Sequence, residues 1–333
     1  MTMRQHSKRV LMFCAGFFGY EKRIAGEIRA QGYEVDHYDE RPNSGFIAKT
    51  CVRYNVGLYR PVIRQYYEKI IQINRDKHYD YVLVVKGEAV NEDIVGLLRS
   101  VYPDAKFVLY LWDSAANIPD CANRMKLYDR VLTFDPQDAK TYGLYFRPLF
   151  FAKEYQAQPE VGSADYVYDF AFIGTAHTIR PLVVKKLGAA CTERGGDCFA
   201  HLFLPHPMVY LYNKVCNPAY RTVKKADIRF DSLHAQQIKE VYQKSNCILD
   251  VEHQKQRGLT MRTIELVGMQ KKIITTNVGV KEYDFYNPSN ICVIDRENPV
   301  VDDAFWEKKY EPIPEEILRR YALESFVKEI FEI

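Results

Sequence analysis

Short apolar runs alternate with amphipathic stretches along the N-terminal half of the chain. The apolar runs have the length of buried strands and lie at residues 10–15, 33–38, 81–85, 106–112 and 130–134. Between them, helical spacing of apolar residues predicts helices at 20–31, 61–75, 92–101 and 123–128. Because strands that alternate with helices build parallel sheets covered on both faces, the pattern predicts an α/β fold with a mostly parallel sheet.

The same alternation begins again after a polar stretch. Residues 152–164 contain Pro159 and Gly162, which favour a loop, and are predicted to be the linker between two domains, 1–151 and 165–333. The second domain is predicted to be another Rossmann-like unit that ends in C-terminal helices, with residues 206–231 forming a loop with short helices. Two such domains would face each other across a cleft, where ligands bind beyond the carboxyl ends of the strands.

Charge and cysteine usage exclude several classes of protein. The 333 residues carry 46 basic and 43 acidic side chains, a balance that argues against a nucleic-acid binder. Basic pairs such as Lys185–Lys186 and Lys224–Lys225 form either a local patch or a solvated face. The eight cysteines include no CxxC pair and predict reduced thiols, and no apolar run approaches the roughly 20 residues that span a bilayer. The sequence therefore predicts a cytoplasmic protein.

The segment from Gly258 to Glu265 has the pattern of a glycine turn that leads into a short helix. Gly258 allows a tight turn, Leu259 follows it, and Thr260 is a good N-cap for a helix that begins at the next residue. A helix N-terminus beside Arg262 is a candidate anion site, and Glu265 one turn later suits two ribose hydroxyls. The segment thus predicts a nucleotide-diphosphate site; the alternative is a solvent-facing ion pair between Arg262 and Glu265.

A second candidate phosphate site follows the first strand of the second domain. Gly174 ends this strand, and a polar turn leads from it into a helix. Thr175, His177, Thr178 and Arg180 can donate hydrogen bonds to phosphate oxygens, together with backbone N–H groups. The alternative is an ordinary strand–turn–helix connection in which Thr178 caps the helix.

Candidate catalytic and acceptor-side residues follow strands of the first domain. Asp113 ends a buried strand and is predicted to be the general base toward an acceptor hydroxyl, with a helix N-cap as the alternative. Glu88 ends another strand and is a second candidate base or a ligand of sugar hydroxyls. Gly16, Phe17 and Gly19 form a turn that either contacts the acceptor or the donor sugar, or is a plain tight turn.

The remaining polar candidates favour structural roles. Asp135 is followed by Pro136, which is typical of a helix N-cap. His201 and His206 lie close in sequence, but no carboxylate or cysteine completes a metal-binding set, so no metal site is predicted.

Three segments give the chain a resemblance to the CgeB-like group of bacterial glycosyltransferases, which have the two-domain GT-B fold. The C-terminal half carries most of the resemblance, and residues 1–80 carry almost none. The three segments are residues 168–174 with Arg180 downstream, residues 258–265 followed by 272–277, and residues 110–114 with 128–135.

This resemblance implies a nucleotide-sugar donor in the C-terminal domain. Glu265 would match the glutamate that binds the donor ribose, while Arg180 and Arg262 would neutralise the diphosphate, together with backbone amides at 258–260. Such enzymes generally need no bound metal or other cofactor, because protein cations stabilise the departing diphosphate. The chain differs from the better-known paired-glutamate pattern, since Gly258 stands where that pattern has its first glutamate.

The sequence therefore predicts a cytoplasmic glycosyltransferase of capsule, exopolysaccharide or lipopolysaccharide synthesis. Its substrates would be a nucleotide-diphosphate sugar and a glycan or lipid-linked oligosaccharide. With a membrane-bound acceptor, the protein would associate peripherally with the inner face of the membrane, through basic or aromatic surface on the N-terminal domain. Two alternatives remain: a nucleotide-sugar epimerase of the same fold, and a non-catalytic sugar- or nucleotide-binding envelope or spore protein.

Overall fold

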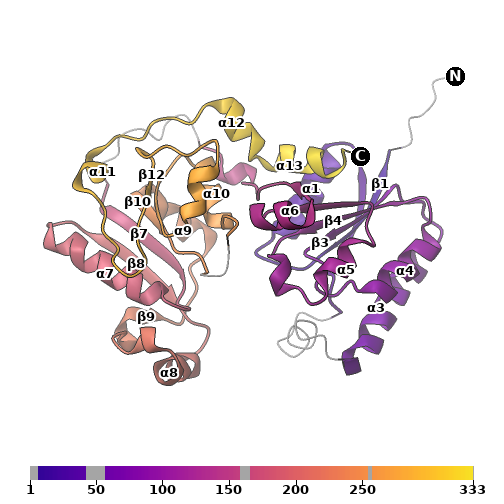
Figure 1. Ribbon diagram of the computed structural model, residues 1–333, viewed down its shortest axis with the longest axis horizontal. Coiled ribbons are helices and arrows are strands. Elements are labelled where there is room, and N and C mark those ends of the chain that lie inside the picture. Colours follow the sequence, from indigo (N-terminus) through magenta and orange to yellow (C-terminus); the bar gives the residue numbers. More distant parts are fainter. Residues whose placement is uncertain (1–6, 43–56, 158–165, 254–256, 333) are drawn as a thin grey trace. The chain divides into compact units, whose positions relative to one another are not determined.

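The chain folds into two compact units. The computed structural model describes residues 7–42, 57–157, 166–253 and 257–332 (Figure 1). Unit 1 comprises Met1–Ala152 together with Arg319–Ile333, and unit 2 comprises Lys153–Leu318.

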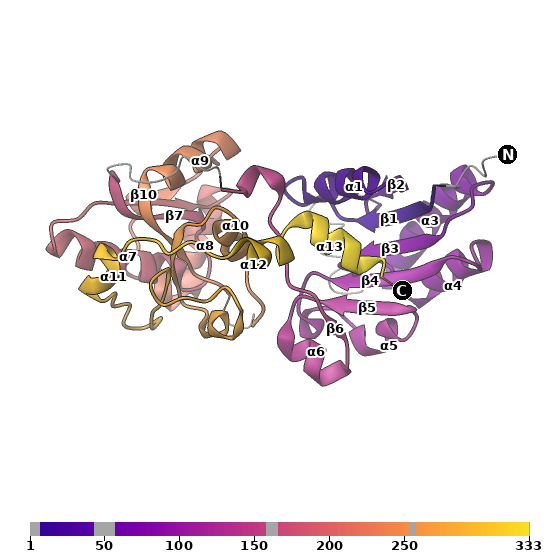
Figure 2. The same ribbon diagram turned by 90° about the horizontal axis from the view of Figure 1, so that it is seen from above.

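Unit 1 is built on a parallel sheet of six strands within the described residues, in the order β2-β1-β3-β4-β5-β6 (Figure 2). The strands are β1 (Arg9–Cys14), β2 (Glu34–Tyr38), β3 (Tyr81–Val85), β4 (Lys106–Leu111), β5 (Arg130–Thr133) and β6 (Tyr145–Phe146). The helices are α1 (Tyr20–Ala30), α3 (Arg60–Asn74), α4 (Glu92–Val101), α5 (Cys121–Met125), α6 (Pro136–Tyr142) and α13 (Leu323–Ile330). Short 3-10 turns occur at Gly57–Tyr59 and Ala115–Asn117.

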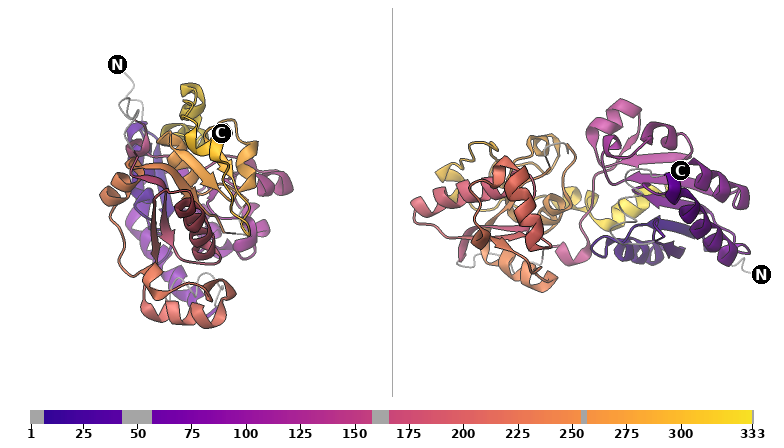
Figure 3. Two further views of the ribbon diagram at one scale, coloured as in Figure 1. Left: turned by 90° about the vertical axis from the view of Figure 1, so that its left-hand side faces the viewer. Right: turned by 90° about the horizontal axis from the view of Figure 1, so that it is seen from below.

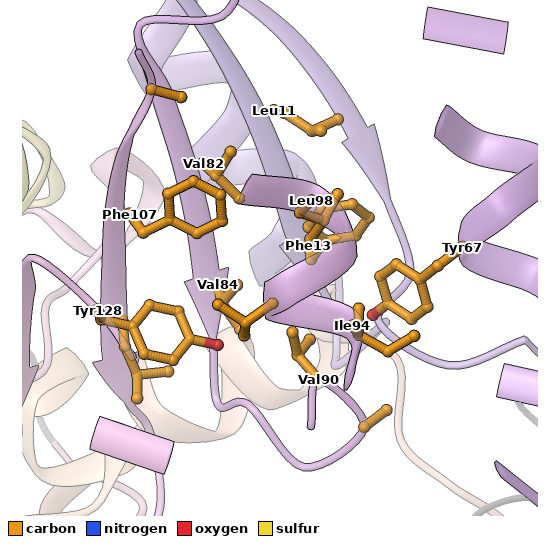
Figure 4. Packing of buried hydrophobic residues seen from close by; sticks show 14 of the residues in the cluster. Leu11, Phe13, Tyr67, Val82, Val84, Val90, Ile94, Leu98, Phe107 and Tyr128 are labelled. Carbon is orange, nitrogen blue, oxygen red and sulfur yellow. The ribbon is translucent and has the colours of Figure 1, made fainter. Parts of the chain in front are cut away.

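One face of this sheet forms a core with α3 and α4. Alternate strand residues such as Phe13, Val84 and Phe107 point to this face, where they meet Tyr67 of α3 and Leu98 of α4 (Figure 4). Each of these side chains is almost fully buried. Because strands such as β1 and β3 are buried on both faces, they stand out in the sequence as continuous apolar runs.

The opposite face of the sheet is covered partly by the C-terminus of the chain. Phe326 of α13 packs against Tyr110 of β4, with ring centroids 4.8 Å apart. The backbone of Phe151 pairs with Ala322, and the Nη2 group of Arg147 donates a hydrogen bond of 2.7 Å to the carbonyl of Arg320. The C-terminal helix predicted for the second domain therefore belongs to unit 1, because its apolar face completes the core of that unit.

Unit 2 is built on a second parallel sheet of six strands in the described residues, in the order β12-β11-β10-β7-β8-β9. The strands are β7 (Tyr168–Thr175), β8 (Cys198–Phe203), β9 (Ile228–Arg229), β10 (Ser245–Asp250), β11 (Lys272–Thr275) and β12 (Ile291–Val293). The helices are α7 (Arg180–Glu193), α8 (Pro207–Cys216), α9 (Ala235–Gln243), α10 (Met261–Gly268), α11 (Asp303–Glu307) and α12 (Glu315–Arg320). The 3-10 turns are Lys153–Tyr155, Pro218–Tyr220, Lys225–Asp227 and Val278–Glu282.

The predicted α/β class with two mostly parallel sheets is confirmed, since every strand pair found in both sheets is parallel. The segment 206–231 is more ordered than predicted, because it contains the ten-residue helix α8. Of the predicted linker 152–164, residues 158–164 lie outside the described part of the chain. No helix within the described ranges is long and apolar enough to cross a membrane.

Candidate functional site

The sheet of unit 2 changes direction between its two central strands. The chain enters at β7 and builds β8 and β9 on one side, then returns to build β10, β11 and β12 on the other. The loops after β7 and β10 therefore leave the same carboxyl edge in opposite directions. In open α/β sheets this is the place where a ligand crevice forms. The residues predicted to bind phosphates follow these two strands.

Two arginines, at the starts of the helices that follow β7 and β10, each reach the carboxyl end of the other strand. Arg262 of α10 donates a hydrogen bond of 2.5 Å from Nη2 to the carbonyl of Ile173 in β7. Arg180, at the start of α7, donates one of 2.6 Å from Nε to the carbonyl of Val251 after β10. Burial, together with the charge of Arg262, lowers the pKa of Arg180 to about 10. Two guanidinium groups at one edge are a candidate site for an anion with more than one charge.

Asp250, the last residue of β10, fixes the turn that contains Gly258. Its Oδ2 atom accepts hydrogen bonds from the hydroxyls of Thr260, at 2.6 Å, and Thr263, at 2.5 Å. Its Oδ1 atom lies 3.4 Å from Nη1 of Arg262. Sequence reasoning missed Asp250, although an aspartate at the carboxyl end of a predicted buried strand was the available signal.

Replacing Asp250 by asparagine is expected to lower the midpoint of thermal unfolding by about 5 °C, because removing one partner of a buried charge pair leaves the other uncompensated. The side chain is 1% exposed and has three polar partners. Differential scanning calorimetry measures the midpoint. Asp197→Asn, at an exposed position of the same unit, is the control and is expected to change it little. Equal midpoints for the two variants would contradict this role of Asp250.

The N-cap predicted for α10 is confirmed, because the Thr260 side chain accepts a hydrogen bond from the N–H of Thr263. The alternative of a solvent-facing ion pair is wrong. Arg262 pairs with Asp250, and Glu265 is only 9% exposed. Burial raises the pKa of Glu265 to about 8.

The turn between β7 and α7 has a strained conformation. Thr178 has a φ of 51°, which a β-branched residue rarely adopts. The alternative, in which Thr178 caps α7, is wrong. The N-cap residue is Ile179, which makes no side-chain hydrogen bond. The hydroxyl of Thr178 instead lies 3.1 Å from Nδ1 of His177. Burial and the charge of Arg180 lower the pKa of His177 to about 4, so its imidazole is neutral at pH 7.

The glycine after β7 allows close approach of a neighbouring group. A Cβ atom at Gly174 would lie 3.0 Å from Nη2 of Arg262, so a glycine leaves room for that guanidinium. The amide of Asn277 lies 3.5 Å from the carbonyl of Gly258 and supports the second turn. Leu259 is buried and offers only its backbone, whereas Thr175 is exposed at the edge.

The acceptor-side residues predicted in unit 1 lie where its own sheet changes direction, after β1. Asp39 accepts a hydrogen bond of 3.0 Å from the N–H of Gly16, and Glu21 accepts one of 3.1 Å from the N–H of Phe17. Gly19 has a φ of 78°, a left-handed conformation that a glycine adopts at little energetic cost. The Phe17 side chain is 52% exposed at this edge.

The two candidate catalytic carboxylates lie beside one lysine that sequence reasoning missed. The Nζ atom of Lys86 is 3.0 Å from Oε1 of Glu88 and 3.9 Å from Oδ2 of Asp113. Lys86 has a φ of 84°, a strained conformation of the kind that clusters at functional sites. Asp113 is not the predicted N-cap, since Ser114 occupies that position of the 3-10 turn.

A fully buried carboxyl group lies beneath this lysine. Oε2 of Glu40 accepts a hydrogen bond of 3.0 Å from the N–H of Gly87, and the side chain is 0% exposed. Burial and the charge of Glu88 raise the pKa of Glu40 from its ordinary value of 4.5 to about 8.

Glu40→Gln is therefore expected to reduce the pH dependence of stability between pH 4.5, the ordinary pKa of this group in the unfolded chain, and about pH 8, its pKa in the folded protein. Between pH 4.5 and about 8 the folded protein holds this proton and the unfolded chain does not, so stability falls as pH rises. Inside this window the group lowers the free energy of unfolding by about 1.4 kcal/mol for each unit by which the pH rises. Above the window it causes no further change. Urea denaturation at several pH values measures it. An unchanged slope in the variant would contradict a neutral Glu40.

The residues predicted to bind the donor come together at the edge of unit 2. Those predicted to be catalytic or to contact the acceptor come together at the edge of unit 1. The described residues contain no cluster of three or more histidine, cysteine, aspartate or glutamate side chains that could hold a metal ion. No family model matches the sequence, and no curated protein matches it either.

Solved structures resemble the chain along nearly its whole length. Sucrose-phosphate synthase from Thermosynechococcus elongatus has a TM-score of 0.63 at 10% identity, with 97% of each chain covered. HepE of Anabaena, solved with UDP-glucose, has a TM-score of 0.63 at 12% identity, with 97% of this chain and 98% of that chain covered. A putative UDP-N-acetylglucosamine 2-epimerase from Listeria monocytogenes has a TM-score of 0.51 at 11% identity, with 97% and 95% covered. The chain therefore has the two-domain α/β fold of the GT-B glycosyltransferases.

Proposed function

We propose that the chain is a glycosyltransferase that moves a sugar from a nucleoside-diphosphate sugar to a hydroxyl group of a glycan. The observation that carries the proposal is the pair of arginines, Arg180 and Arg262, that cross between the two central strands of unit 2. A diphosphate is the anion that this pair fits best, because each phosphate can meet one guanidinium.

The remaining residues take roles that follow from their positions. The N–H groups at 258–260 and the start of α10 would complete the diphosphate site, and Glu265 would meet the ribose hydroxyls. When the acceptor oxygen bonds to the anomeric carbon, the bond from that carbon to the phosphate oxygen breaks. The proton of the acceptor hydroxyl passes to Asp113, and the charge that develops on the leaving diphosphate is stabilised by the two arginines. No step requires a metal ion.

The resemblance to the CgeB-like group supports a narrower proposal about the pathway. The acceptor would be a growing capsule, exopolysaccharide or lipopolysaccharide chain, including a lipid-linked oligosaccharide, and the enzyme would work in the cytoplasm. Several structural neighbours were solved with UDP or UDP-glucose, which makes uridine nucleotides the first donors to test.

A thermal-shift screen against nucleoside diphosphates and nucleotide sugars tests the proposal. A ligand at about 100 times its dissociation constant should stabilise the protein by roughly 2.7 kcal/mol. Nucleoside diphosphate should then be released from the matching nucleotide sugar only when a glycan acceptor is present. Epimerisation without an acceptor would indicate the epimerase alternative, and binding without turnover would indicate a non-catalytic module. No shift with any nucleotide would overturn the proposal.

A further inference from the structure

Helix α8 of unit 2 carries a row of exposed apolar side chains. Met208, Leu211, Tyr212 and Val215 follow one another at the spacing of a single helical face. They are 63%, 55%, 67% and 86% exposed, respectively. These four residues are called the α8 stripe below.

The rotation of α8 about its axis is fixed by contacts on its other side. Tyr210 is buried, and its hydroxyl donates a hydrogen bond of 3.1 Å to the carbonyl of Val223. The ammonium of Lys214 donates to the carbonyls of Tyr220, Arg221 and Val223 at 2.8 to 2.9 Å. These contacts hold the buried side of α8 against unit 2, so the α8 stripe faces solvent. Helix α8 lies at the lower end of unit 2 in Figure 1 and in the left view of Figure 3.

The segment that contains the α8 stripe and continues to Arg229 is strongly basic. Residues 207–229 contain five basic side chains and one acidic one, Asp227, which gives this segment a net charge of +4 against +3 for the whole chain. The rest of the chain therefore has a net charge of −1. Four of the cations are exposed in the structure, and they are Arg221, Lys224, Lys225 and Arg229.

We propose that the α8 stripe and these four cations form a binding surface for an anionic lipid bilayer. An amphipathic helix binds such a surface by placing its apolar residues at the boundary of headgroups and acyl chains, while lysine and arginine meet the lipid phosphates. A nucleic acid would use the cations and leave four large apolar side chains in water. The combination of both features favours the lipid surface.

This surface is connected to the edge of unit 2 that carries the arginine pair. Asn217, directly after α8, donates a hydrogen bond of 3.1 Å from Nδ2 to the carbonyl of Thr178. The hydroxyl of Tyr220 donates one to the carbonyl of Ala176. Docking through α8 would thus hold the β7–α7 turn close to the bilayer, which suits a lipid-linked acceptor. The inference goes beyond the proposed function, and it locates membrane contact on unit 2, whereas the sequence predicted it on the N-terminal domain.

Flotation with vesicles of phosphatidylcholine, with or without phosphatidylglycerol, tests the proposal on the full chain. The wild-type protein is expected to bind only the vesicles that contain phosphatidylglycerol, and less tightly at high salt. Leu211→Asp combined with Val215→Asp is expected to weaken binding at least about tenfold, and so is Lys224→Glu combined with Lys225→Glu.

Matched controls separate this surface from general effects of charge. Val62→Asp with Ile73→Asp replaces two exposed aliphatic residues of α3, and Lys308→Glu with Lys309→Glu reverses an exposed lysine pair elsewhere. Both control proteins are expected to bind as the wild type does, and circular dichroism confirms that every variant is folded.

The proposal is overturned if the wild-type protein does not float with anionic vesicles, or if the α8 variants bind as tightly as their controls. It is equally overturned if light scattering shows a wild-type dimer that Leu211→Asp with Val215→Asp dissociates, without any vesicle binding. The α8 stripe would then be an interface between two copies of the chain. None of these outcomes depends on turnover, so they are distinguishable from a failure of the glycosyltransferase proposal.

Discussion

Replacing Arg180 or Arg262 by alanine is expected to weaken the binding of a nucleoside diphosphate about 30- to 150-fold. Each arginine would lose charge-assisted hydrogen bonds to phosphate, which contribute about 2 to 3 kcal/mol in a partly buried site. Arg262→Lys keeps the charge but not the planar fork, so its binding should fall between the alanine variant and the wild type. Isothermal titration calorimetry measures the dissociation constants.

Arg194→Ala is the matched control for both variants. It removes an arginine of the same unit whose Nη2 lies 3.8 Å from Asp169. Asp169 is near the start of β7, at the opposite edge of the sheet from the proposed diphosphate. The dissociation constant of Arg194→Ala for the nucleoside diphosphate is therefore expected to equal that of the wild type. An equal loss of affinity in the control, or full affinity in folded Arg180→Ala and Arg262→Ala proteins, would contradict a diphosphate site at the arginine pair.

The parts of the structure that sequence predicted well are local in origin. The strands were recognisable because buried parallel strands are continuous apolar runs, and the helices because their apolar residues recur at helical spacing. Helix caps are local as well. Thr260 and Asp135 each accept hydrogen bonds from backbone N–H groups two or three residues ahead, as predicted from the two residues and their neighbours.

The parts that sequence missed depend on contacts between distant segments. Asp250 contacts Thr260 and Thr263, which follow it by 10 and 13 residues in the sequence. Lys86 joins Glu88 and Asp113 because β3 and β4 are neighbours in the sheet. The C-terminal helix could be predicted as a helix, but its apolar face alone does not indicate which of two sheets it covers. An amphipathic pattern shows which face of a helix is apolar but does not identify the surface that this face contacts. Helix α8 is an example, because its apolar face is exposed in the structure.

Asp113→Asn is expected to lower kcat about 100- to 10,000-fold while the KM for the donor changes little, because the variant retains the donor site and lacks the proton acceptor. We propose Asp113 rather than Glu88 for this role because of its orientation and accessibility. Oδ1 of Asp113 accepts hydrogen bonds from the N–H of Ser114, at 3.0 Å, and from Nδ2 of Asn117, at 2.8 Å, which orient the carboxylate. Its Oδ2 atom lies 3.9 Å from Lys86 and is left for an acceptor hydroxyl.

Glu88 is held more tightly and is less accessible. Its side chain is 13% exposed, against 34% for Asp113, and its carboxylate lies 3.0 Å from the ammonium of Lys86. Glu88→Gln is therefore expected to release Lys86 toward Asp113 and to cause a smaller loss of rate than Asp113→Asn. Asp104→Asn, at the amino end of β4, is the control and should leave kcat unchanged. If Glu88→Gln abolished turnover while Asp113→Asn retained it, the base would be Glu88, and Asp113 would serve only to position Lys86.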